Sequence, residues 1–431
     1  MARGGARAGA RLPRSFCRLR GLFHLCVIVL AMQTPSSPSH ARPQQAPRGA
    51  PEIAGAALEP MPFSALSGWA ADDHAAAFAA FRLTCVGVVS GESGLRQGVA
   101  PSAALTAVCQ AAIAMPEDTP ARETRAFFER HFQPHRVRPH DSEGFLTGYF
   151  EPEFSGALSL TARHDTPLLA RPNDLVTLAD GETVPGLDPA LRGARRVETA
   201  TGVRFEPYAD RAAIEDGALG DDARALVYLE RVDAFMAHVQ GSVRVRISEG
   251  QGAGPLGETA RRYAYAGRNG HAYTGIARLL VTERGFAPAD LTAPRLVAWL
   301  RDNPEEARLL MRRNRSYIFF READELLPHH GPLGGASVQL TPGRSLAIDR
   351  AIWPYGLPVW IEAKLPVAQD EPAQVWQRLM IAQDTGSAIV GPARADIFFG
   401  SGSAAGEQAG IVRHAAEKFV VLLPVSPGRG T

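Results

Sequence analysis

The chain has 431 residues, which is long enough for two domains that each bury a core. Hydrophobic residues make up 45% and charged residues 21%, as in an ordinary soluble globular protein. The formal net charge of +1 gives no electrostatic reason to expect a nucleic acid partner. The 42 glycines and 33 prolines favour turns and short strands over long helices.

Residues 1–41 have the three-part layout of a secretory signal. A basic segment is followed by a short apolar run at 21–32, which is short for a membrane span, and then by small residues. We expect cleavage near Ala41 and export; an uncleaved N-terminal anchor is the alternative. The residues before Cys26 lack the small side chain of a lipoprotein signal, so the sequence does not support a lipid anchor.

Two cysteines, Cys85 and Cys109, remain after the expected cleavage. An even pair in an oxidising compartment predicts one disulfide. It would close a loop of about 24 residues and contribute about 3 kcal/mol to stability. Two buried free thiols are the alternative.

The exported chain is predicted to begin with a flexible leader at 42–60, rich in proline and alanine. Two helices are then expected, at 68–85 and 119–132, because each combines a start signal with an apolar stripe of phenylalanines. The first folded segment is therefore predicted to be helical.

The pattern changes at 145–156, where short β-rich runs begin to alternate with Gly, Pro and Asp turns as far as about residue 285. Two helices at 292–303 and 303–314 interrupt this pattern. Six further short strands follow, starting with "RSYIFFRE" and ending with "KFVVLLPV". They predict a small closed barrel.

The string Asp384-Thr385-Gly386 is identical to the active-site signature of aspartic proteases. Those enzymes need two aspartates that share a proton, and this chain has one copy of the string. The chain is also too long to be one lobe of a small dimeric protease. We therefore set the peptidase hypothesis aside and expect a turn at the end of an apolar strand, where Gly386 permits tight geometry.

Two other patterns lack the context that a cofactor or metal site requires. The run "GSGSAAG" at 400–406 resembles a dinucleotide fingerprint, but no acidic residue follows at the expected distance. The 12 histidines are scattered and form no H-E-x-x-H motif. We expect neither a cofactor nor a metal.

Three aspartates, Asp349, Asp384 and Asp396, lie at or beside predicted strands. Asp396 stands out because its neighbours in "RADIFFG" are apolar. Apolar surroundings disfavour the charged form of a carboxyl group, which would suit a general acid near neutral pH. An exposed aspartate at a strand edge is the alternative.

Several segments together resemble the membrane-bound lytic murein transglycosylase A family. They are "GYFEPEFSG", "HVQGSVRVR", "YAYAGRNGHAYTGIARLL", "NRSYIFFRE" and "AQDTGSAIVGPARADIFFGSGSAAGEQAG", and they occur in the family's order between about residues 145 and 424. The resemblance implies a mainly β fold with N-terminal and central helices. One domain would be a double-psi β-barrel that carries the family's three aspartates, with a groove between it and a second domain.

The resemblance also implies how the chain is divided. The first domain would comprise residues 61–147 and 286–424, and a second β-rich domain at 148–285 would be inserted into it. Residues 425–431 would form a tail. A groove of this kind would hold a glycan strand of peptidoglycan, in a monomeric protein of the Gram-negative periplasm, with possible outer-membrane association. Cell-wall synthesis and division proteins are further candidate partners.

Members of this family cleave the β-1,4 bond between N-acetylmuramic acid (MurNAc) and N-acetylglucosamine (GlcNAc) and form a 1,6-anhydro ring. Because the sugar's own C6 hydroxyl attacks, one carboxyl group can serve as acid and then as base, whereas ordinary glycosidases need two. The matching position is Asp396, with Asp384 and Asp349 in support. Candidate sugar contacts, each with a core role as the alternative, are Tyr149, Gln240 and Tyr317. A non-catalytic peptidoglycan-binding protein and a peptidoglycan hydrolase are the alternative functions.

Overall fold

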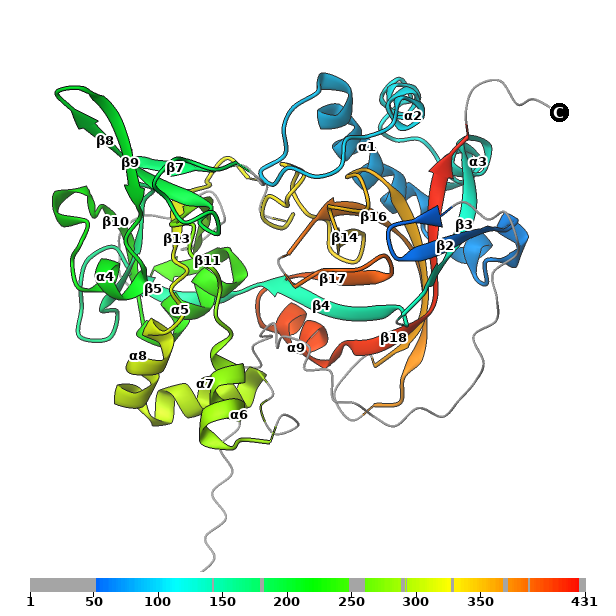
Figure 1. Ribbon diagram of the computed structural model, residues 1–431. Coiled ribbons are helices and arrows are strands. Elements are labelled where there is room, and N and C mark those ends of the chain that lie inside the picture. Colours follow the sequence, from blue (N-terminus) through cyan, green and yellow to red (C-terminus); the bar gives the residue numbers. More distant parts are fainter. Residues whose placement is uncertain are drawn as a thin grey trace, which may run out of the picture.

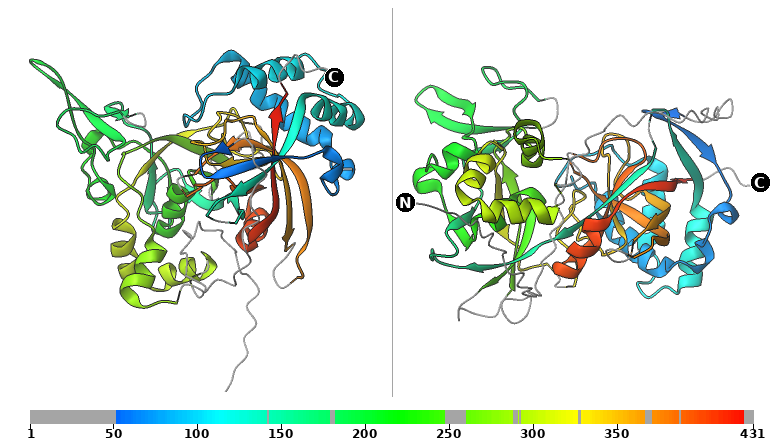
Figure 2. Two further views of the ribbon diagram at one scale, coloured as in Figure 1. Left: turned by 45° about the vertical axis from the view of Figure 1, so that its right-hand side comes forward. Right: turned by 90° about the horizontal axis from the view of Figure 1, so that it is seen from below.

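The computed structural model describes residues 52–141, 143–178, 182–247, 260–287, 291, 293–326, 329–366, 371–386 and 388–425. They form two β-rich bodies side by side (Figure 1). One body contains both ends of the described chain, and the other contains the middle of the sequence, an arrangement that both views of Figure 2 preserve. The prediction of a mainly β fold with N-terminal and central helices is confirmed.

The first body is built on a nine-stranded sheet in which six strands close into a barrel. Closure comes from the pairing of β18 with β4, so that the order around the barrel is β18, β15, β16, β14, β17 and β4. In chain order the barrel strands are β4 (Phe145–Glu151), β14 (Ser345–Ile348), β15 (Pro358–Leu365), β16 (Gln374–Asp384), β17 (Arg394–Ser401) and β18 (Arg413–Pro424). The sheet extends beyond β18 through β3 (Phe132–Pro139), β2 (Ala56–Pro60) and β1 (Glu52–Ile53). The prediction of a flexible leader at 42–60 is therefore wrong for its last part, because β2 pairs with β3 and buries Ala56 and Leu58.

Barrel strands alternate between an apolar interior and an outer face, because successive side chains of a strand point to opposite sides. Leu346 and Ile348 of β14 belong to the same buried cluster as Ala395 and Ile397 of β17. The residue between each of these pairs points away from that cluster. Asp396 is therefore on the outer face, although its neighbours in sequence fill the core. The closed barrel agrees with the sequence prediction, and its double-psi connectivity stays a prediction.

Helices cover another part of the barrel. Trp360, Leu379 and Val420, from β15, β16 and β18, pack with the apolar side of the N-terminal helices. Cys85 and Cys109 form a disulfide between two of these helices, with Cα atoms 4.8 Å apart. The helices of this body are η1 (Phe63–Ala65), η2 (Trp69–Ala71), α1 (His74–Ser90), α2 (Ala103–Ile113), α3 (Ala121–His131) and α9 (Ser403–Ile411).

The second body contains a six-stranded sheet and a three-stranded sheet, the latter including a β-hairpin that projects from the molecule (Figure 1). The larger sheet, in chain order, has β5 (Glu153–Ala157), β6 (Thr166–Leu169), β10 (Ala225–Leu229), β11 (Ser242–Ile247), β12 (Ala260–Arg268) and β13 (Ile318–Glu322). The smaller sheet has β7 (Leu175–Thr177), β8 (Gly193–Thr199) and β9 (Gly202–Pro207). The helices are α4 (Arg211–Glu215), η3 (Gly220–Asp222), α5 (Arg231–Gln240), α6 (Ile276–Arg284), α7 (Ala293–Asp302) and α8 (Pro304–Arg312).

The second body extends further along the chain than residue 285, where the sequence placed its end. β13 pairs with β12, with Tyr265 opposite Phe320. Leu296 of α7 and Met311 of α8 lie in the apolar cluster of the larger sheet. These helices interrupt the β pattern of the sequence, but their apolar faces pack on the second body. The strands and helices of the second body therefore continue to the end of β13.

A buried ion pair lies where the chain first crosses between the bodies. Glu151, the last residue of β4, is 1% exposed. Its two carboxylate oxygens lie 2.9 and 3.1 Å from Nε and Nη2 of Arg262, a β12 residue with 0% exposure. Arg244 of β11 is 3.3 Å away, and the Ser401 hydroxyl of β17 donates a 2.7 Å hydrogen bond. Both sheets thus meet at one carboxylate.

Candidate active site

A row of side chains crosses the outer face of the barrel, and the register of three strand pairs creates it. Ala347 of β14 is opposite Asp384 of β16 on one side and opposite Asp396 of β17 on the other. Asp396 is in turn opposite Thr147 of β4. Paired residues on neighbouring strands project to the same face, and a register shift in the β14–β16 pairing, between Ala382 and Asp384, brings Asp384 to this face although Ala382 lies in the core. The row therefore brings together two of the three predicted aspartates, separated by the small side chain of Ala347.

Asp396 is a buried carboxyl group with 4% exposure. Burial raises its pKa to about 6, and the charge of Asp384 adds to this effect. The guanidinium of Arg394 and the hydrogen bond from Thr147 act in the opposite direction without cancelling it. The group can therefore hold a proton close to neutral pH, which is the property expected of it from its apolar neighbours in sequence.

A short hydrogen-bond chain positions Asp396. Nη2 of Arg394 donates to the Thr147 hydroxyl over 2.7 Å, and this hydroxyl donates to Oδ1 of Asp396 over 2.6 Å. Neither Thr147 nor Arg394 is among the site residues predicted from the sequence. Both could have been predicted, because residues two apart in a strand face the same side. Thr147 precedes Tyr149 by two residues in β4, and Arg394 precedes Asp396 by two residues in β17.

Asp384 accepts three hydrogen bonds at the end of β16. The backbone N–H groups of Gly335 and Thr385 donate to Oδ1, each over 2.8 Å. The Tyr149 hydroxyl donates to Oδ2 over 2.8 Å. Burial, and then the charge of Asp384, raise the pKa of Tyr149, so its phenol keeps its proton. The ring of Tyr149 also lies 5.2 Å from that of Phe398, which holds it beside the row.

Asp349, the third aspartate, has a different environment. It follows β14 and is 8% exposed. Its Oδ1 accepts from the N–H of Ala351 over 3.0 Å and its Oδ2 from the N–H of Gly391 over 2.8 Å. These bonds tie a turn to the segment before β17. The geometry does not bring Asp349 into the row with Asp384 and Asp396.

The predicted sugar contacts Gln240 and Tyr317 both belong to the second body. Gln240 is the last residue of α5 and is partly exposed. Tyr317 is 4% exposed and packs in an apolar cluster with Phe319. Its ring centroid lies 4.3 Å from that of His238. The structure therefore favours the core alternative for Tyr317.

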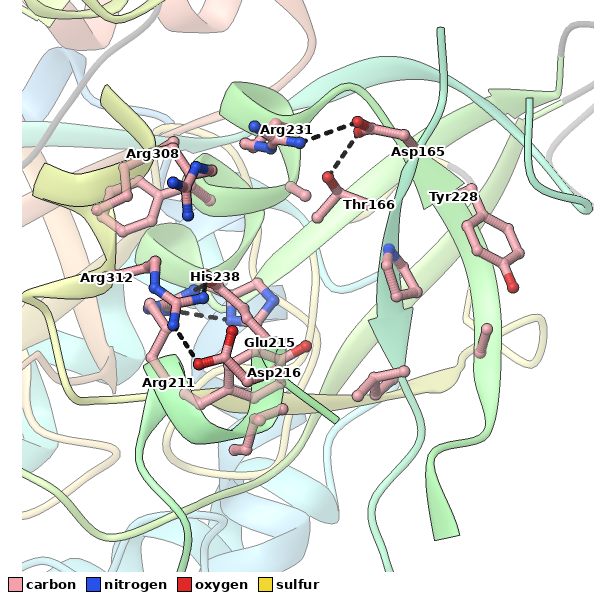
Figure 3. Close-up of a pocket in the computed structure, with 18 of the residues that line it drawn as sticks. Asp165, Thr166, Arg211, Glu215, Asp216, Tyr228, Arg231, His238, Arg308 and Arg312 are labelled. Carbon is pink, nitrogen blue, oxygen red and sulfur yellow. Dashed lines mark hydrogen bonds and ion pairs between the residues drawn. The ribbon is translucent and has the colours of Figure 1, made fainter. Parts of the chain in front are cut away.

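Tyr317 also lines a cavity of about 440 Å³ between α4, α5, α8, β6 and β10 (Figure 3). Arg211 is buried in its wall and donates to the carbonyl oxygens of Asn314 and Ser316, 3.0 and 2.8 Å away. Burial and the charge of Arg211 hold the pKa of His238 well below its usual range. None of the row residues lines this cavity, so it is separate from the two aspartates.

Two further observations concern ions and membranes. Across the described ranges, no three His, Cys, Asp or Glu side chains gather closely enough to hold a metal ion. None of the helices within these ranges combines the length and the apolar character needed to cross a bilayer.

The fold and the row define a class of protein. It has two β-rich bodies, and on the outer face of its barrel a carboxyl group with a raised pKa lies beside a second carboxyl group and a phenol. Such a set is suited to acid–base chemistry on a polar substrate.

Comparison with known proteins specifies this class. Residues 145–321 match the family model described as the MltA specific insert domain, and residues 344–422 match the 3D domain. The first match ends close to the end of β13, in agreement with the strand pairing. The chain is 33% identical over 222 residues to the membrane-bound lytic murein transglycosylase A of Vibrio cholerae. The aligned segment covers 50% of this chain and 56% of that relative. The alignment thus spans a little over half of the relative's length.

Solved structures extend the similarity to most of the chain. The membrane-bound lytic murein transglycosylase of Agrobacterium tumefaciens is similar with a TM-score of 0.72 and 34% identity, over 85% of this chain and 97% of that one. MltA of Neisseria gonorrhoeae is similar with a TM-score of 0.69 and 29% identity, over 89% and 97%. The chain belongs to the membrane-bound lytic murein transglycosylase A family.

Proposed function

We propose that this protein is a lytic transglycosylase of peptidoglycan. It cleaves the β-1,4 bond between MurNAc and GlcNAc and leaves a 1,6-anhydro ring on the MurNAc side. Family membership supports the reaction class. The observation that carries the residue assignment is the environment of Asp396, a carboxyl group that is 4% exposed and has its pKa raised to about 6 by burial.

Asp396 performs two proton transfers in this proposal. Its protonated form donates to the oxygen of the glycosidic bond as the C1–O bond breaks, so that GlcNAc leaves as an alcohol. The C6 hydroxyl of MurNAc then attacks C1, and the carboxylate of Asp396 takes the hydroxyl proton. The proton count balances, no water is consumed, and a single carboxyl group suffices because the nucleophile comes from the sugar itself.

The rest of the row supports these transfers. Positive charge develops at C1 as the bond breaks. Asp384 stabilises this charge from β16, on the other side of β14, and its three hydrogen bonds hold it in place. Thr147 and Arg394 are positioning residues for Asp396. Gln240 binds the acetamido groups of the glycan from the second body, across the groove that the family resemblance predicts.

The domain division and the cellular setting belong to the same proposal. The barrel body corresponds to the first domain and the chain from β5 to the end of β13 to the inserted one. The protein is exported to the periplasm, where the disulfide between Cys85 and Cys109 is stable. It acts there on glycan strands as a monomer, with cell-wall synthesis and division proteins as candidate partners. Cell fractionation tests the location: a cytoplasmic pool of mature length would contradict it.

Product analysis on purified sacculi tests the activity. Mass spectrometry of the wild-type digest should detect 1,6-anhydro-muropeptides. Reducing-end muramic acid would identify a hydrolase instead, and intact glycan bound to the protein would identify a non-catalytic binding protein.

The Asp396→Asn variant tests the residue assignment. We expect turnover to fall by at least about 10²-fold, because general acid–base catalysis contributes about 10²–10⁴-fold. Thermal unfolding should show that the fold persists. Asp165→Asn is the matched control, since Asp165 pairs with Arg231 on the surface of the second body. An Asp396→Asn protein nearly as active as the wild type would refute the assignment.

A further inference from the structure

The loop between α1 and α2 places one arginine between the two bodies. Nη1 of Arg96 donates to the carbonyl oxygen of Thr385 over 2.7 Å, on the barrel side. The guanidinium carbon lies 5.8 Å from the ring centroid of Tyr265, which is a β12 residue of the second body. The Arg96 side chain thus contacts both bodies, and it is partly exposed.

Arg96 is next to the row of site residues. Its backbone N–H donates to the carbonyl oxygen of Gly335 over 3.1 Å. The N–H groups of Gly335 and Thr385 are the backbone donors to Asp384. The same two residues therefore hold both Arg96 and Asp384, so the guanidinium is at the Asp384 end of the row.

The loop that carries Arg96 is firmly held. A Cβ atom at Gly94 would lie 2.4 Å from the carbonyl oxygen of Gly335, so only glycine permits this approach of two loops. The N–H of Val99 donates to the carbonyl oxygen of Arg350 over 2.9 Å. The disulfide between Cys85 and Cys109 joins the helices on either side of the loop. The position of Arg96 is thus set before any ligand arrives.

The charge of Arg96 has no carboxylate partner in the part of the chain that the structure describes. Its neighbours there are a carbonyl oxygen and an aromatic ring. This contrasts with Arg262, which is paired with Glu151, and with Arg344, whose Nη1 lies 2.8 Å from the carboxylate of Asp72. A guanidinium has five N–H donors in a planar fork that fits a carboxylate. Arg96 can therefore receive a carboxylate from a ligand.

Peptidoglycan carries such a group and a polymer of GlcNAc alone does not. MurNAc differs from GlcNAc by a lactyl ether, which ends in a carboxylate or continues into a peptide stem with carboxylates of its own. We propose that Arg96 binds an anionic substituent of the glycan and selects MurNAc-containing strands over neutral β-1,4 glycans. The proposal rests on the proposed function, because it assigns the substrate of the same site.

Binding measurements in the Asp396→Asn protein separate affinity from turnover. Isothermal titration would use three oligosaccharides of equal length: a β-1,4 GlcNAc oligomer, an alternating GlcNAc–MurNAc oligomer with free lactyl carboxylates, and the same oligomer with peptide stems. Adding Arg96→Gln should weaken binding of an anionic oligomer about tenfold, as expected for a lost charge-assisted hydrogen bond, and leave the GlcNAc oligomer within twofold. If Arg96→Gln weakens the binding of both anionic oligomers, Arg96 binds the lactyl group or the stem residue attached to it. If it weakens only the binding of the stem-bearing oligomer, Arg96 binds a carboxylate of the stem.

Two further variants serve as controls. Arg96→Lys keeps the charge and should retain part of the preference. Arg284→Gln removes a positive charge from a surface ion pair with Glu306 and should change none of the three affinities. Added salt should reduce the Arg96 effect.

The proposal is contradicted if Arg96→Gln weakens the binding of all three oligomers equally, which would indicate a disturbed Asp384 turn. It is also contradicted if the substitution weakens the binding of none of them. A protein with Arg96 intact that shows no preference for the anionic oligomers would contradict it as well. These failures differ from a failure of the proposed function. If the wild-type protein forms no anhydro products but the Arg96-dependent preference remains, only the catalytic proposal fails.

Discussion

Glu151 and Asp396 are both buried carboxyl groups on barrel strands, with 1% and 4% exposure, yet their surroundings differ. Glu151 has Arg262 and Arg244 within 3.3 Å, from the other body. Asp396 accepts a hydrogen bond from Thr147, with Arg394 on the far side of that hydroxyl. One carboxylate is compensated by two guanidinium groups and the other by a hydroxyl.

This difference in surroundings distinguishes a carboxyl group that stabilises the fold from one that can exchange a proton. A buried carboxylate held by arginines at the crossing between two sheets fixes their mutual position. A buried carboxyl group that lacks such compensation has its charged form disfavoured, which makes it able to give and take a proton near neutral pH. Burial alone therefore does not identify a catalytic acid; the arrangement of the nearest cations does.

Glu151→Gln should produce the largest effect on stability. It leaves Arg262 buried at the crossing without a counter-charge, and breaking such a pair costs about 3–5 kcal/mol. Chemical denaturation followed by circular dichroism measures this loss. The matched control is Glu153→Gln, two residues along the chain, because Glu153 pairs with the 55% exposed side chain of Arg246. We expect Glu153→Gln to lower the free energy of unfolding by less than about 1 kcal/mol. Similar losses in both variants would contradict the distinction.

Asp396→Asn should have the opposite sign and depend on pH. The pKa of the folded group is about 6, above its ordinary value of 3.8. The stability that the acid form contributes is therefore present below pH 3.8 and is lost as the pH rises through 6. Removing the ionisable group should raise the free energy of unfolding at pH 8 by up to about 3 kcal/mol and leave it nearly unchanged at pH 4. A gain at pH 4 equal to that at pH 8 would contradict the raised pKa.

The pH dependence of kcat/KM should reveal the same group in the active protein. In the proposed reaction protonated Asp396 is the acid, so kcat/KM should fall as the pH rises through about 6. The hydrogen bond from Thr147 lowers the pKa of Asp396. Thr147→Val should therefore move this limb upward by about one pH unit. Thr147→Ser, which keeps the hydroxyl, should leave the limb in place; a shift in the serine variant as large as in the valine variant would point to packing instead.

Tyr149→Phe should have the smallest effect of the series. It removes one of the three hydrogen bonds to Asp384 and leaves the two backbone donors. A loss of about 1 kcal/mol corresponds to about a fivefold lower kcat/KM. Tyr228→Phe, in the cavity wall of the second body, should leave kcat/KM unchanged. A loss of 10³-fold for Tyr149→Phe would instead make the phenol a direct participant in proton transfer.

Much of the barrel could be predicted from the sequence, and one strand could not. Five of its six strands, β14 to β18, overlap segments predicted as barrel strands, although β16 and β18 begin earlier than predicted. The sixth segment predicted as a barrel strand, "RSYIFFRE", contains β13 of the other body's larger sheet. The barrel is completed by β4 in its place. Both segments are apolar and short, so local pattern cannot choose between them. Only the pairing of β4 with β17 and β18 decides it.

The sequence by itself determined that Asp396 lies among apolar neighbours, that Cys85 and Cys109 are the pair available to form a disulfide, and that the chain has the family's segments in order. These properties depend on composition and spacing along the chain. The tertiary structure decided that Asp384 and Asp396 flank Ala347 while Asp349 holds a turn, and that Tyr317 packs in a core. It also placed Arg96 between the bodies. Such placements depend on strand register and on contacts between distant segments, which local periodicity does not specify.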